Sequence, residues 1–511
     1  SFKRSAIFSA IISGLIKIFI AEHEGLNLAS AIVVFFGGVA TYFFGASSRL
    51  TPTVMAPYLM QWEIMRHARS LGYTEYDLWG ISPRGVPDHH WRGISDFKEK
   101  FGGGNVIIEG IKPHQASATS RGLFLKRLAV LFFDTDTARA RKRYEYFCEG
   151  RYGYYLVSRM TGFLARSGMV RRVLRSADYF FSPKGFFAHL YDRYQPDIIF
   201  STDLQNENDT SIMQDARKRG VPTIGMIRSW DNPTQRAIRI FPDTMVVGSD
   251  TLKEEVIRYC RFPASRITVI GNPHYDRYLA GPSVGREEFF AQFGLDPSRR
   301  TILYAPVGDH LLRHNDVDEH VMDILTRTGE QVLVRFPPDE AVRLLNFIKP
   351  PQMGYDRPGR AFRQATFPDR EITPEDDRRL IDSLFYCAMA ITGPTSIPLD
   401  AALIGKPSII VNFYPTPRGF CGAIYSYWCS HIKKLITTGG VRYVQSPEEL
   451  LEAMEDYFRD PSLDENGREK IRALWFSHAD GRAGERLARE LLSLLGLEDA
   501  SPHTPTGARG L

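Results

Sequence analysis

The C-terminal part of the chain alternates short apolar runs with longer, partly polar stretches. One of these stretches, Asp209–Arg219, reads as a helix that stops at Gly220. Short buried strands alternating with helices predict a parallel, doubly wound α/β sheet. The alternation pauses over residues 275–300 and then restarts, which predicts two Rossmann-like lobes with a ligand cleft between them. The predicted strands are Asp197–Ser201, Thr223–Ile227, Thr244–Val247, Ile267–Ile270, Thr301–Ala305, Gln331–Arg335, Ala388–Ile391, Ser408–Val411 and Arg442–Val444.

The N-terminal part has a different pattern. The segment Leu28–Ser47 contains no charged residue and is long enough for a membrane-spanning helix. However, Gly37–Gly38 divides it into two runs that are rich in β-branched and aromatic residues. A hairpin of two buried strands is therefore the preferred interpretation. Pro57–Leu71 has apolar residues at helical spacing and predicts a helix, whereas Tyr76–Ile81 and Asn105–Ile111 predict strands.

Length and composition are those of a globular protein with several domains. The chain has 511 residues, of which 43% are apolar and 24% charged, and its net charge is +5. A chain of this length is expected to divide into about two to four domains. The mild positive charge does not indicate a nucleic-acid footprint. Pattern and composition together predict a domain over 1–115, a linker over 116–122, a first lobe over 123–280, a second lobe over 281–498 and a disordered tail over 499–511.

The cysteines and the N-terminal sequence bear on the cellular compartment in which the protein is expected to fold. No cysteine pair has CxxC spacing, so the sequence predicts neither a zinc site nor a disulfide framework, and it fits a reducing cytoplasm. No signal-peptide pattern is evident. The chain begins at Ser1 and opens in apolar sequence, which favours a fragment of a longer protein. The five cysteines are Cys148, Cys260, Cys387, Cys421 and Cys429.

The turn Thr392–Ser396 is the strongest candidate for an anion site. It connects a predicted strand to a predicted helix over Ile397–Ile404, and Gly393, Thr395 and Ser396 lie in it. Free N–H groups and the positive end of a helix dipole meet at such a turn, which favours a phosphate. The alternative is an ordinary strand-to-helix loop with Ser396 as the N-cap.

Further polar residues follow the other predicted strands. Asp231 is the first candidate for the general base that an inverting glycosyl transfer needs, with Asp203 and His274 as the next candidates. Arg228 and Arg335 could clamp phosphates with two hydrogen bonds each. The alternative for each acidic or histidine side chain is a turn-capping role.

Basic clusters lie in the first part of the predicted first lobe. Residues 139–143 read RARKR, and Arg171, Arg172 and Arg175 lie among apolar residues. Such clusters are usually solvated helix faces, and the alternative is contact with an anionic membrane surface. Because residues 120–190 read mostly as helical, the first lobe is expected to lack its first strand-helix unit.

Four ordered motifs in the N-terminal part resemble the C-terminal part of the Fem (FemABX-type) peptidoglycan-bridge aminoacyltransferases, which use acetyltransferase-like (GNAT) domains. The resemblance implies transfer of an aminoacyl group from tRNA to a cell-wall peptide precursor. It also implies that Lys98 stabilises charge at the reacting carbonyl, with Phe97 beside it. The alternative is that Lys98 and Lys100 are solvated lysines. Only the last part of the second acetyltransferase-like domain is present. The motifs are YFFGASS (42–48), PYLMQWE (57–63), YDLWGI (76–81) and FKEKFG (97–102).

Residues 190–490 resemble the GT-B glycosyltransferase superfamily, in particular CDP-glycerol glycerophosphotransferase-like surface-polysaccharide proteins. The resemblance implies that the turn Thr392–Ser396 binds the donor diphosphate and that Asp400 holds the ribose or a nearby hydroxyl. The sequence departs from the pattern at Arg335–Pro338, where relatives often have Arg-Pro-His-Pro, and at the first-lobe turn Arg228–Asn232, which lacks a histidine-glycine. These departures argue against glycerophosphate transfer. The motifs are GNPHYD (271–276), ILYAP (302–306) and VRFPP (334–338).

The fold class expected from these patterns is α/β: a partial GNAT-like α+β segment followed by a two-lobed GT-B-like module. The leading functional hypothesis is a bacterial cell-envelope transferase that uses a nucleotide-activated sugar, with no cofactor and no metal, and an envelope glycan or lipid-linked acceptor. It would work in the cytoplasm, in peripheral contact with the inner membrane. One alternative is an aminoacyltransferase of peptidoglycan bridges that uses aminoacyl-tRNA. The other is an inactive nucleotide-binding scaffold.

Overall fold

The structure is a computed structural model, and the chain divides into two compact units. One unit lies within Ser1–Lys112 and includes Gly496–Leu511, and the other is Pro113–Leu495. Each unit is described by itself. The structure describes residues 16–36, 38–48, 52–81, 92–102, 135–150, 152–153, 167–182, 184–235, 238–309, 312, 315–338, 342, 344–361 and 370–497.

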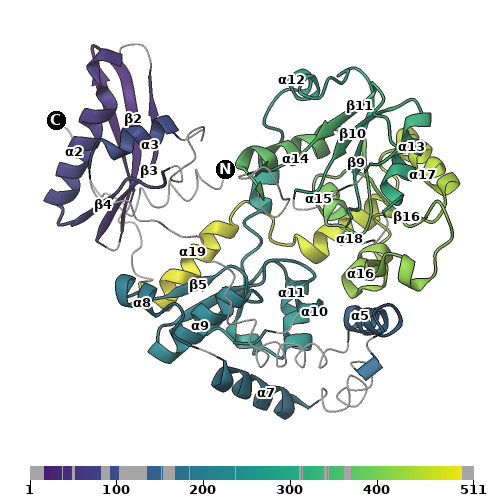
Figure 1. Ribbon diagram of the computed structural model, residues 1–511, viewed down its shortest axis with the longest axis horizontal. Helices are drawn as coiled ribbons and strands as arrows, with labels where there is room; N and C mark the ends of the chain where they lie inside the picture. The colour runs from purple at the N-terminus through teal and green to yellow at the C-terminus, as the bar shows by residue number, and fades with distance from the viewer. Residues whose placement is uncertain are drawn as a thin grey trace, which may run out of the picture. The chain divides into compact units, whose positions relative to one another are not determined.

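The first unit is a small sheet with a helix packed on one face (Figure 1). The predicted hairpin is confirmed, because β2 and β3 pair antiparallel on either side of residues 37–38. Alternate residues of β2, among them Ala31, Val33 and Phe35, are buried against Met60 and Ile64 of α2, as a half-buried strand requires. The strand order is β1-β2-β3-β4. The elements are β1 (Ile16–His23), β2 (Leu26–Phe36), β3 (Val39–Ser47), η1 (Pro52–Val54), α2 (Ala56–Ser70), β4 (Glu75–Asp77) and α3 (Arg92–Glu99).

Two strand predictions in this unit differ from the structure. The strand predicted over Tyr76–Ile81 is the shorter β4, which pairs in parallel with the first residues of β3. β1 was not predicted from the sequence, and it pairs with β2 from Leu26 to Val34. The strand predicted over Asn105–Ile111 lies outside the described residues. Within the described ranges, no helix is long and apolar enough to cross a membrane.

The first lobe of the second unit has a parallel sheet of order β5-β6-β7-β8. Its two central strands, β6 and β7, are largely buried, as in a parallel sheet that helices cover on both faces. Gly225 in β6 gives Leu204 room, since a Cβ there would lie 2.2 Å from Leu204 Cδ2. The elements are α5 (Asp136–Phe147), α7 (Gly168–Phe181), α8 (Ala188–Tyr194), β5 (Ile199–Ser201), α9 (Glu207–Arg219), β6 (Thr223–Met226), α10 (Asn232–Gln235), β7 (Thr244–Val247), α11 (Asp250–Glu255), the π-turn η3 (Val256–Cys260), η4 (Ala264–Arg266), β8 (Ile267–Val269) and η5 (Tyr275–Ala280).

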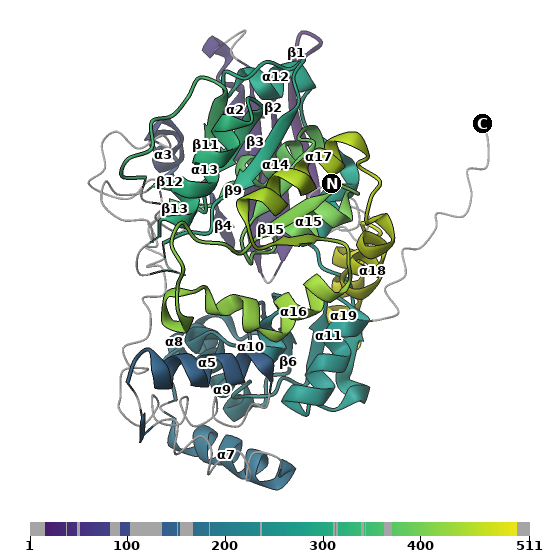
Figure 2. The same cartoon turned by 90° about the vertical axis from the view of Figure 1, so that its right-hand side faces the viewer.

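The second lobe has a parallel sheet of order β11-β10-β9-β14-β15-β16. Helices lie on both of its faces in Figures 1 and 2. A small antiparallel pair, β12 and β13, is separate from this sheet. The elements are α12 (Arg286–Ala291), β9 (Thr301–Ala305), α13 (Val317–Arg327), β10 (Gln331–Arg335), β11 (Met353–Asp356), β12 (Arg360–Ala361), β13 (Arg370–Glu371), α14 (Pro374–Tyr386), β14 (Met389–Thr392), α15 (Ile397–Leu403), β15 (Ser408–Val411), η7 (Phe420–Gly422), η8 (Tyr425–Trp428), α16 (Ser430–Thr437), β16 (Arg442–Val444), α17 (Pro447–Arg459), α18 (Glu465–Trp475) and α19 (Ala483–Leu494).

The last helix of the second unit packs on the first lobe, although it follows the second lobe in sequence. Leu487 and Leu491 of α19 contact Ile224 of β6 and Val246 of β7. Two parallel α/β lobes joined by a C-terminal helix that returns to the first lobe form the GT-B arrangement. The predicted fold class, a GT-B-like module that follows an α+β segment, is confirmed.

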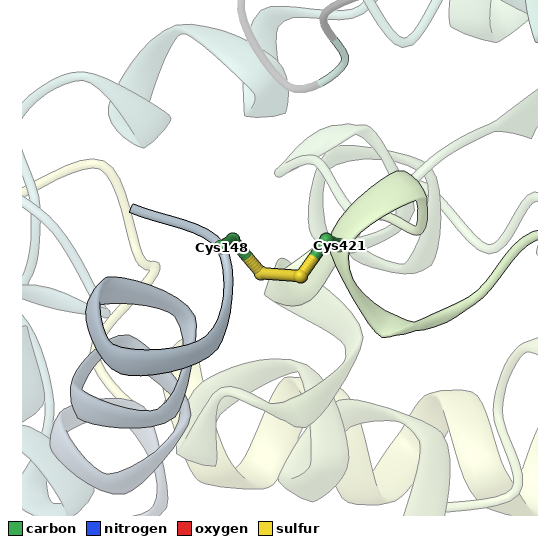
Figure 3. Close-up of a disulfide and its surroundings, with 2 residues drawn as sticks. All are labelled: Cys148 and Cys421. Atoms are coloured by element: carbon green, nitrogen blue, oxygen red, sulfur yellow. A yellow bond between two sulfur atoms is a disulfide. The ribbon is translucent and has the colours of Figure 1, made fainter. Parts of the chain in front are cut away.

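The sequence prediction of no disulfide was wrong. Cys148, just after α5, and Cys421, in η7, form a disulfide with a Cα–Cα distance of 5.3 Å (Figure 3). The two cysteines are 273 positions apart, so their spacing contains no local motif. They meet because α5 packs against the second-lobe segment that contains η7 and η8, where Tyr144 and Tyr425 lie ring to ring at 5.4 Å.

Candidate functional site

Asp203 and Arg228 meet at the carboxyl edge of the first-lobe sheet. They follow β5 and β6, which are neighbours in a parallel sheet, so both strand ends reach the same edge. Arg228 Nη1 lies 3.7 Å from Asp203 Oδ2, and the arginine side chain is 66% exposed. Asp203 also accepts a hydrogen bond from the N–H of Gln205 at 3.2 Å, which is the turn-capping role named above as its alternative. The arginine side of this pair is open to a ligand.

Asp231, between β6 and α10, lies near His431 of the second lobe. Burial lowers the pKa of His431, and the negative charge of Asp231 partly offsets this effect. The indole ring of Trp230 meets the imidazole edge-on at 4.9 Å. Within the described residues, the buried Nδ1 of His431 has no hydrogen-bond partner. A neutral imidazole beside a carboxylate can accept a proton. Asp231 and His431 together are the Asp231–His431 pair below.

α5 lies against α10 of the first lobe and α16 of the second lobe (Figure 2). On the first-lobe side, the hydroxyl of Thr135 donates to the carbonyl of Thr234 at 2.8 Å. On the second-lobe side, the N–H of Ser430 donates to the hydroxyl of Thr137 at 2.9 Å. Ser430 precedes His431 at the start of α16, so these bonds position the imidazole relative to Asp231.

Three of the predicted site residues converge around two tyrosines where the lobes join, the half-buried Tyr275 and the buried Tyr278. The imidazole of His274 meets Tyr275 edge-on at 5.2 Å and Tyr278 at 5.9 Å. Asp400 lies against the same tyrosines and near Arg335, and burial raises its pKa to about 7. The buried hydroxyl of Tyr278 makes no hydrogen bond of ordinary geometry within the described residues, although it interacts electrostatically with Asp400. Below, these five residues are called the joint cluster.

The prediction that Arg335 clamps a phosphate is not supported by its surroundings. Its side chain is 9% exposed and forms an ion pair with Asp356, which is 3% exposed. Arg335 Nη2 also donates to the carbonyl of Asp376 at 2.8 Å. The guanidinium is therefore bound by other parts of the second lobe, because β11 and α14 close over the end of β10. Asp400 is likewise enclosed, at 4% exposed.

The turn after β14 packs closely on the end of β9. A Cβ at Gly393 would lie 2.6 Å from Val307 Cγ2, so glycine is needed at this position. The hydroxyl of Thr395 accepts from the N–H of Ile397 at 3.3 Å and lies 3.0 Å from the hydroxyl of Thr392. The side chain of Ser396 makes no cap hydrogen bond. Ser396 thus occupies the N-cap position named above as the alternative, but the first N–H of the helix is bound by the Thr395 hydroxyl and not by the Ser396 side chain. Ser396 is exposed at the carboxyl edge of the sheet.

Asp318 fixes the turn after β9, and this role was not predicted from the sequence. Its buried carboxylate accepts from the Tyr304 hydroxyl at 2.6 Å and from the N–H groups of Val307 and Gly308 at 2.8 Å and 3.2 Å. It thereby holds the turn after β9 against Gly393. An aspartate in the first turn of α13 was the available signal, but its partners are set by tertiary packing.

Lys98 in the first unit is buried, with an exposed fraction of 7%. Its Nζ donates to the carbonyl of Gly80 at 2.8 Å and lies 5.9 Å from the ring centre of Tyr42. Burial lowers its pKa. Phe97 packs against Tyr58 at 4.8 Å. The alternative of a solvated lysine was wrong for Lys98, because α3 turns it toward the sheet, whereas Lys100 is exposed.

Within the described part of the chain, no group of three His, Cys, Asp or Glu side chains is placed to hold a metal ion. The structure thus presents two sets of candidate residues in the second unit. One set is open and lies at the strand ends near the Asp231–His431 pair. The other is the joint cluster, in which Tyr278, Arg335 and Asp400 are buried.

Comparison with known proteins agrees with the two resemblances. Residues 12–110 match the FemAB family. The lipid II:glycine glycyltransferase of Staphylococcus epidermidis is 34% identical over 82 residues, which are 16% of this chain and 20% of that protein. The chain therefore spans about a fifth of the length of that relative.

The second unit has relatives of its own. The lipid-A-disaccharide synthase of Geobacter sulfurreducens is 24% identical over 313 residues, which are 59% of this chain and 76% of that protein. Among solved structures, the wall teichoic acid polymerase TagF is 12% identical with a TM-score of 0.38, over 59% of this chain and 72% of that chain. The curated relatives named here are thus a glycyltransferase and a disaccharide synthase.

Proposed function

We propose that the second unit transfers a sugar or similar group from a nucleotide-activated donor to a glycan or lipid-linked acceptor of the bacterial cell envelope. The observation that carries this proposal is the Asp231–His431 pair. In this pair an acidic residue of the first lobe interacts electrostatically with a histidine of the second lobe. The similarity to a lipid-A-disaccharide synthase over 313 residues supports it. The donor is the activated substrate, and the proposal needs no metal or other cofactor.

Asp231 is the proposed general base. The proton of an acceptor hydroxyl passes to the Asp231 carboxylate as the acceptor oxygen forms a bond to the anomeric carbon of the donor. The bond from that carbon to the donor diphosphate breaks, and the nucleoside diphosphate leaves with the bonding electrons. The neutral imidazole of His431 is placed beside the carboxylate to share the proton. Asp203 is less suited, because its carboxylate lies beside the positive charge of Arg228, whereas the Asp231 carboxylate accepts a hydrogen bond from the neutral amide of Gln235.

The donor phosphates are proposed to lie between Arg228 and the turn that contains Ser396. Arg228 supplies an exposed positive charge. Ser396 supplies an exposed hydroxyl that no cap hydrogen bond uses. Charge-assisted hydrogen bonds from arginine to phosphate are among the stronger polar contacts that a protein makes.

A lipid-linked acceptor bears on where in the cell the protein would work. We propose that the protein works in the cytoplasm, in peripheral contact with the inner face of the plasma membrane. This position would bring the strand-end residues to an acceptor that cannot leave the bilayer.

The test is release of nucleoside diphosphate from a panel of nucleotide sugars in the presence of envelope lipid extract. Asp231→Asn is expected to lower the rate by about 100-fold, a typical contribution of a general base. Asp250→Asn is the matched control, because the Asp250 side chain is 64% exposed and is not part of the proposed site. Equal rates for wild type and Asp231→Asn would remove Asp231 from the mechanism. Saturable nucleotide binding without turnover of any donor would favour an inactive scaffold.

A second candidate function is aminoacyl transfer to a peptidoglycan precursor by the first unit. The buried Lys98 favours it, because a cation held at a fixed place can stabilise a developing oxyanion. Transfer from aminoacyl-tRNA to a lipid II-type acceptor is the assay. Lys98→Ala is expected to abolish transfer, while Lys100→Ala, which changes an exposed lysine on the same helix, should leave it intact. No transfer by the wild-type chain would exclude this function for the chain as it stands.

A further inference from the structure

An arginine-rich pocket of ≈ 830 Å³ lies between α7 and the first-lobe core. Seven arginines and one carboxylate, Asp243, are among its lining residues. Both cartoon views place α7 at the periphery of its lobe (Figures 1 and 2). Such an excess of positive charge in one pocket favours an anionic ligand.

Two of these arginines are fixed by the protein. Arg175 donates from Nε to the carbonyl of Ile238 at 3.1 Å and from Nη2 to the carbonyl of Cys260 at 2.9 Å. Carbonyl oxygens orient this guanidinium but do not cancel its charge. Arg239 is paired with Asp178 through two bonds of 3.0 Å. The wall of the pocket is therefore preformed and keeps a net positive charge.

Two other arginines are available to a ligand. Arg172 and Arg261 are exposed, line the pocket and have no hydrogen bond or ion pair within the described residues. The positive charge of Arg261 adds to burial in lowering the pKa of Arg171. Repulsion between neighbouring guanidinium groups is relieved when an anion binds between them.

The outer face of α7 is apolar. Met169 is 74% exposed, Val173 58% and Phe180 76%. Their positions i, i+4 and i+11 place them on one side of the helix, and Phe181, 62% exposed, lies at its end. Large apolar side chains exposed in one stripe indicate an interaction surface. A soluble phosphate would occupy the arginine pocket but would leave this stripe unexplained.

We propose that α7 lies in the interface of an anionic membrane, with its apolar stripe among the acyl chains and a lipid headgroup phosphate in the arginine pocket. A helix with one apolar face beside a basic face is suited to lie in the plane of a bilayer surface. Each arginine near an anionic leaflet contributes about 1 kcal/mol. The proposal deepens the peripheral membrane contact put forward under the proposed function and names the surface that makes it.

Co-sedimentation of the full chain with lipid vesicles tests this surface, with no donor or acceptor present, so that its outcome is independent of glycosyl transfer. The wild type is expected to sediment with vesicles of phosphatidylglycerol and phosphatidylcholine and to stay in solution with phosphatidylcholine alone. Arg172→Ala combined with Arg261→Ala should weaken binding by about 30-fold, as two lost charges predict. Met169→Ser combined with Phe180→Ser should weaken it as strongly, because the stripe no longer enters the bilayer.

Matched controls change exposed residues away from α7. Leu345→Ser and Ile348→Ser remove side chains that are 81% and 88% exposed in the second lobe, and Arg459→Ala removes a cation that is 75% exposed. All three controls should bind as the wild type does. Equal binding to neutral and anionic vesicles, or undiminished binding by the Arg172 and Arg261 double variant, would overturn the proposal. It would also be overturned if inorganic phosphate bound to the pocket while vesicles failed to sediment the protein.

Discussion

Arg228 and Arg335 occupy similar places in their lobes, but their surroundings differ. Each lies at the carboxyl end of a strand in a parallel sheet, and the sequence suggested a phosphate clamp for both. Arg228 is 66% exposed and lies 3.7 Å from a carboxylate. Arg335 is 9% exposed and is bound by Asp356 and by the Asp376 carbonyl. A position at the end of a strand is therefore not sufficient evidence that an arginine binds phosphate. An arginine can bind a ligand only if its own lobe leaves the guanidinium accessible.

The largest expected effect is loss of stability on Arg335→Ala. The change leaves the buried carboxylate of Asp356 without its main partner, although Arg379 remains 3.4 Å from it. Removing one partner of a buried ion pair costs about 3–5 kcal/mol. Urea unfolding of the second unit, followed by circular dichroism, measures this loss. An unchanged unfolding midpoint would show that Arg335 is less enclosed than the structure indicates.

The next effect is a pH dependence of stability that arises from Asp400. Burial raises its pKa in the folded protein to about 7, above the value of about 4 in an unfolded chain. Between these values the folded state binds the proton and the unfolded state does not, so stability falls as pH rises from about 4 to about 7. The loss is at most about 4 kcal/mol.

Asp400→Asn removes the titrating group and is expected to flatten this part of the profile. Unfolding measured at pH 5 and pH 8 gives the difference between wild type and variant. The difference should shift in favour of Asp400→Asn at the higher pH. The exposed Asp250 supplies the control variant, Asp250→Asn. A wild-type profile that already rises over this interval would contradict the assignment unless Asp400→Asn rises more steeply.

A smaller loss of stability is expected for only one of two neighbouring hydroxyl residues, Thr395 and Ser396. Thr395 caps the N–H of Ile397, so Thr395→Ala should lower stability by about 1 kcal/mol, as loss of a helix cap does. Ser396 makes no cap hydrogen bond, so Ser396→Ala should leave stability unchanged. If Ser396 binds the donor, Ser396→Ala weakens nucleotide binding by about 1 kcal/mol instead. Equal loss of stability in both variants would contradict the assignment of the cap to Thr395 alone.

The smallest effect on stability is expected for Arg228→Ala. An exposed ion pair contributes about 0.2–1 kcal/mol, and Asp203 keeps the N–H of Gln205 as a partner. The unfolding midpoint should therefore be close to that of the wild type. A loss as large as that of Arg335→Ala would contradict the comparison on which the site assignment rests.

Much of the fold could be predicted because most central strands of the second unit are short, continuous apolar runs that are buried in the structure. The runs Thr244–Val247, Thr301–Ala305, Gln331–Arg335 and Ser408–Val411 are strands with the bounds that the sequence indicated. Their apolar residues are continuous and the flanking residues are polar, so the boundaries are marked locally. β1 was missed, although its residues lie next to the hairpin that was predicted.

The site was less predictable because its partners come from distant parts of the chain. Arg335 is enclosed by β11 and α14, two elements that the sequence reading did not identify. His431 reaches Asp231 only because α5 joins the lobes through Thr135 and Thr137. The Cys148–Cys421 disulfide depends on the same packing of α5. Residue type and spacing indicate which groups can do chemistry, whereas burial and tertiary partners decide which of them are free to do it.

Calorimetric titration of nucleoside diphosphates into the wild type and Arg228→Ala tests the central claim most directly. We expect saturable binding of at least one nucleoside diphosphate to the wild type. In Arg228→Ala the affinity should be about tenfold lower, because a charge-assisted bond to phosphate contributes about 1.5 kcal/mol. Absence of saturable binding to the folded wild type, or equal affinity in the two proteins, would contradict a phosphate-binding role for Arg228.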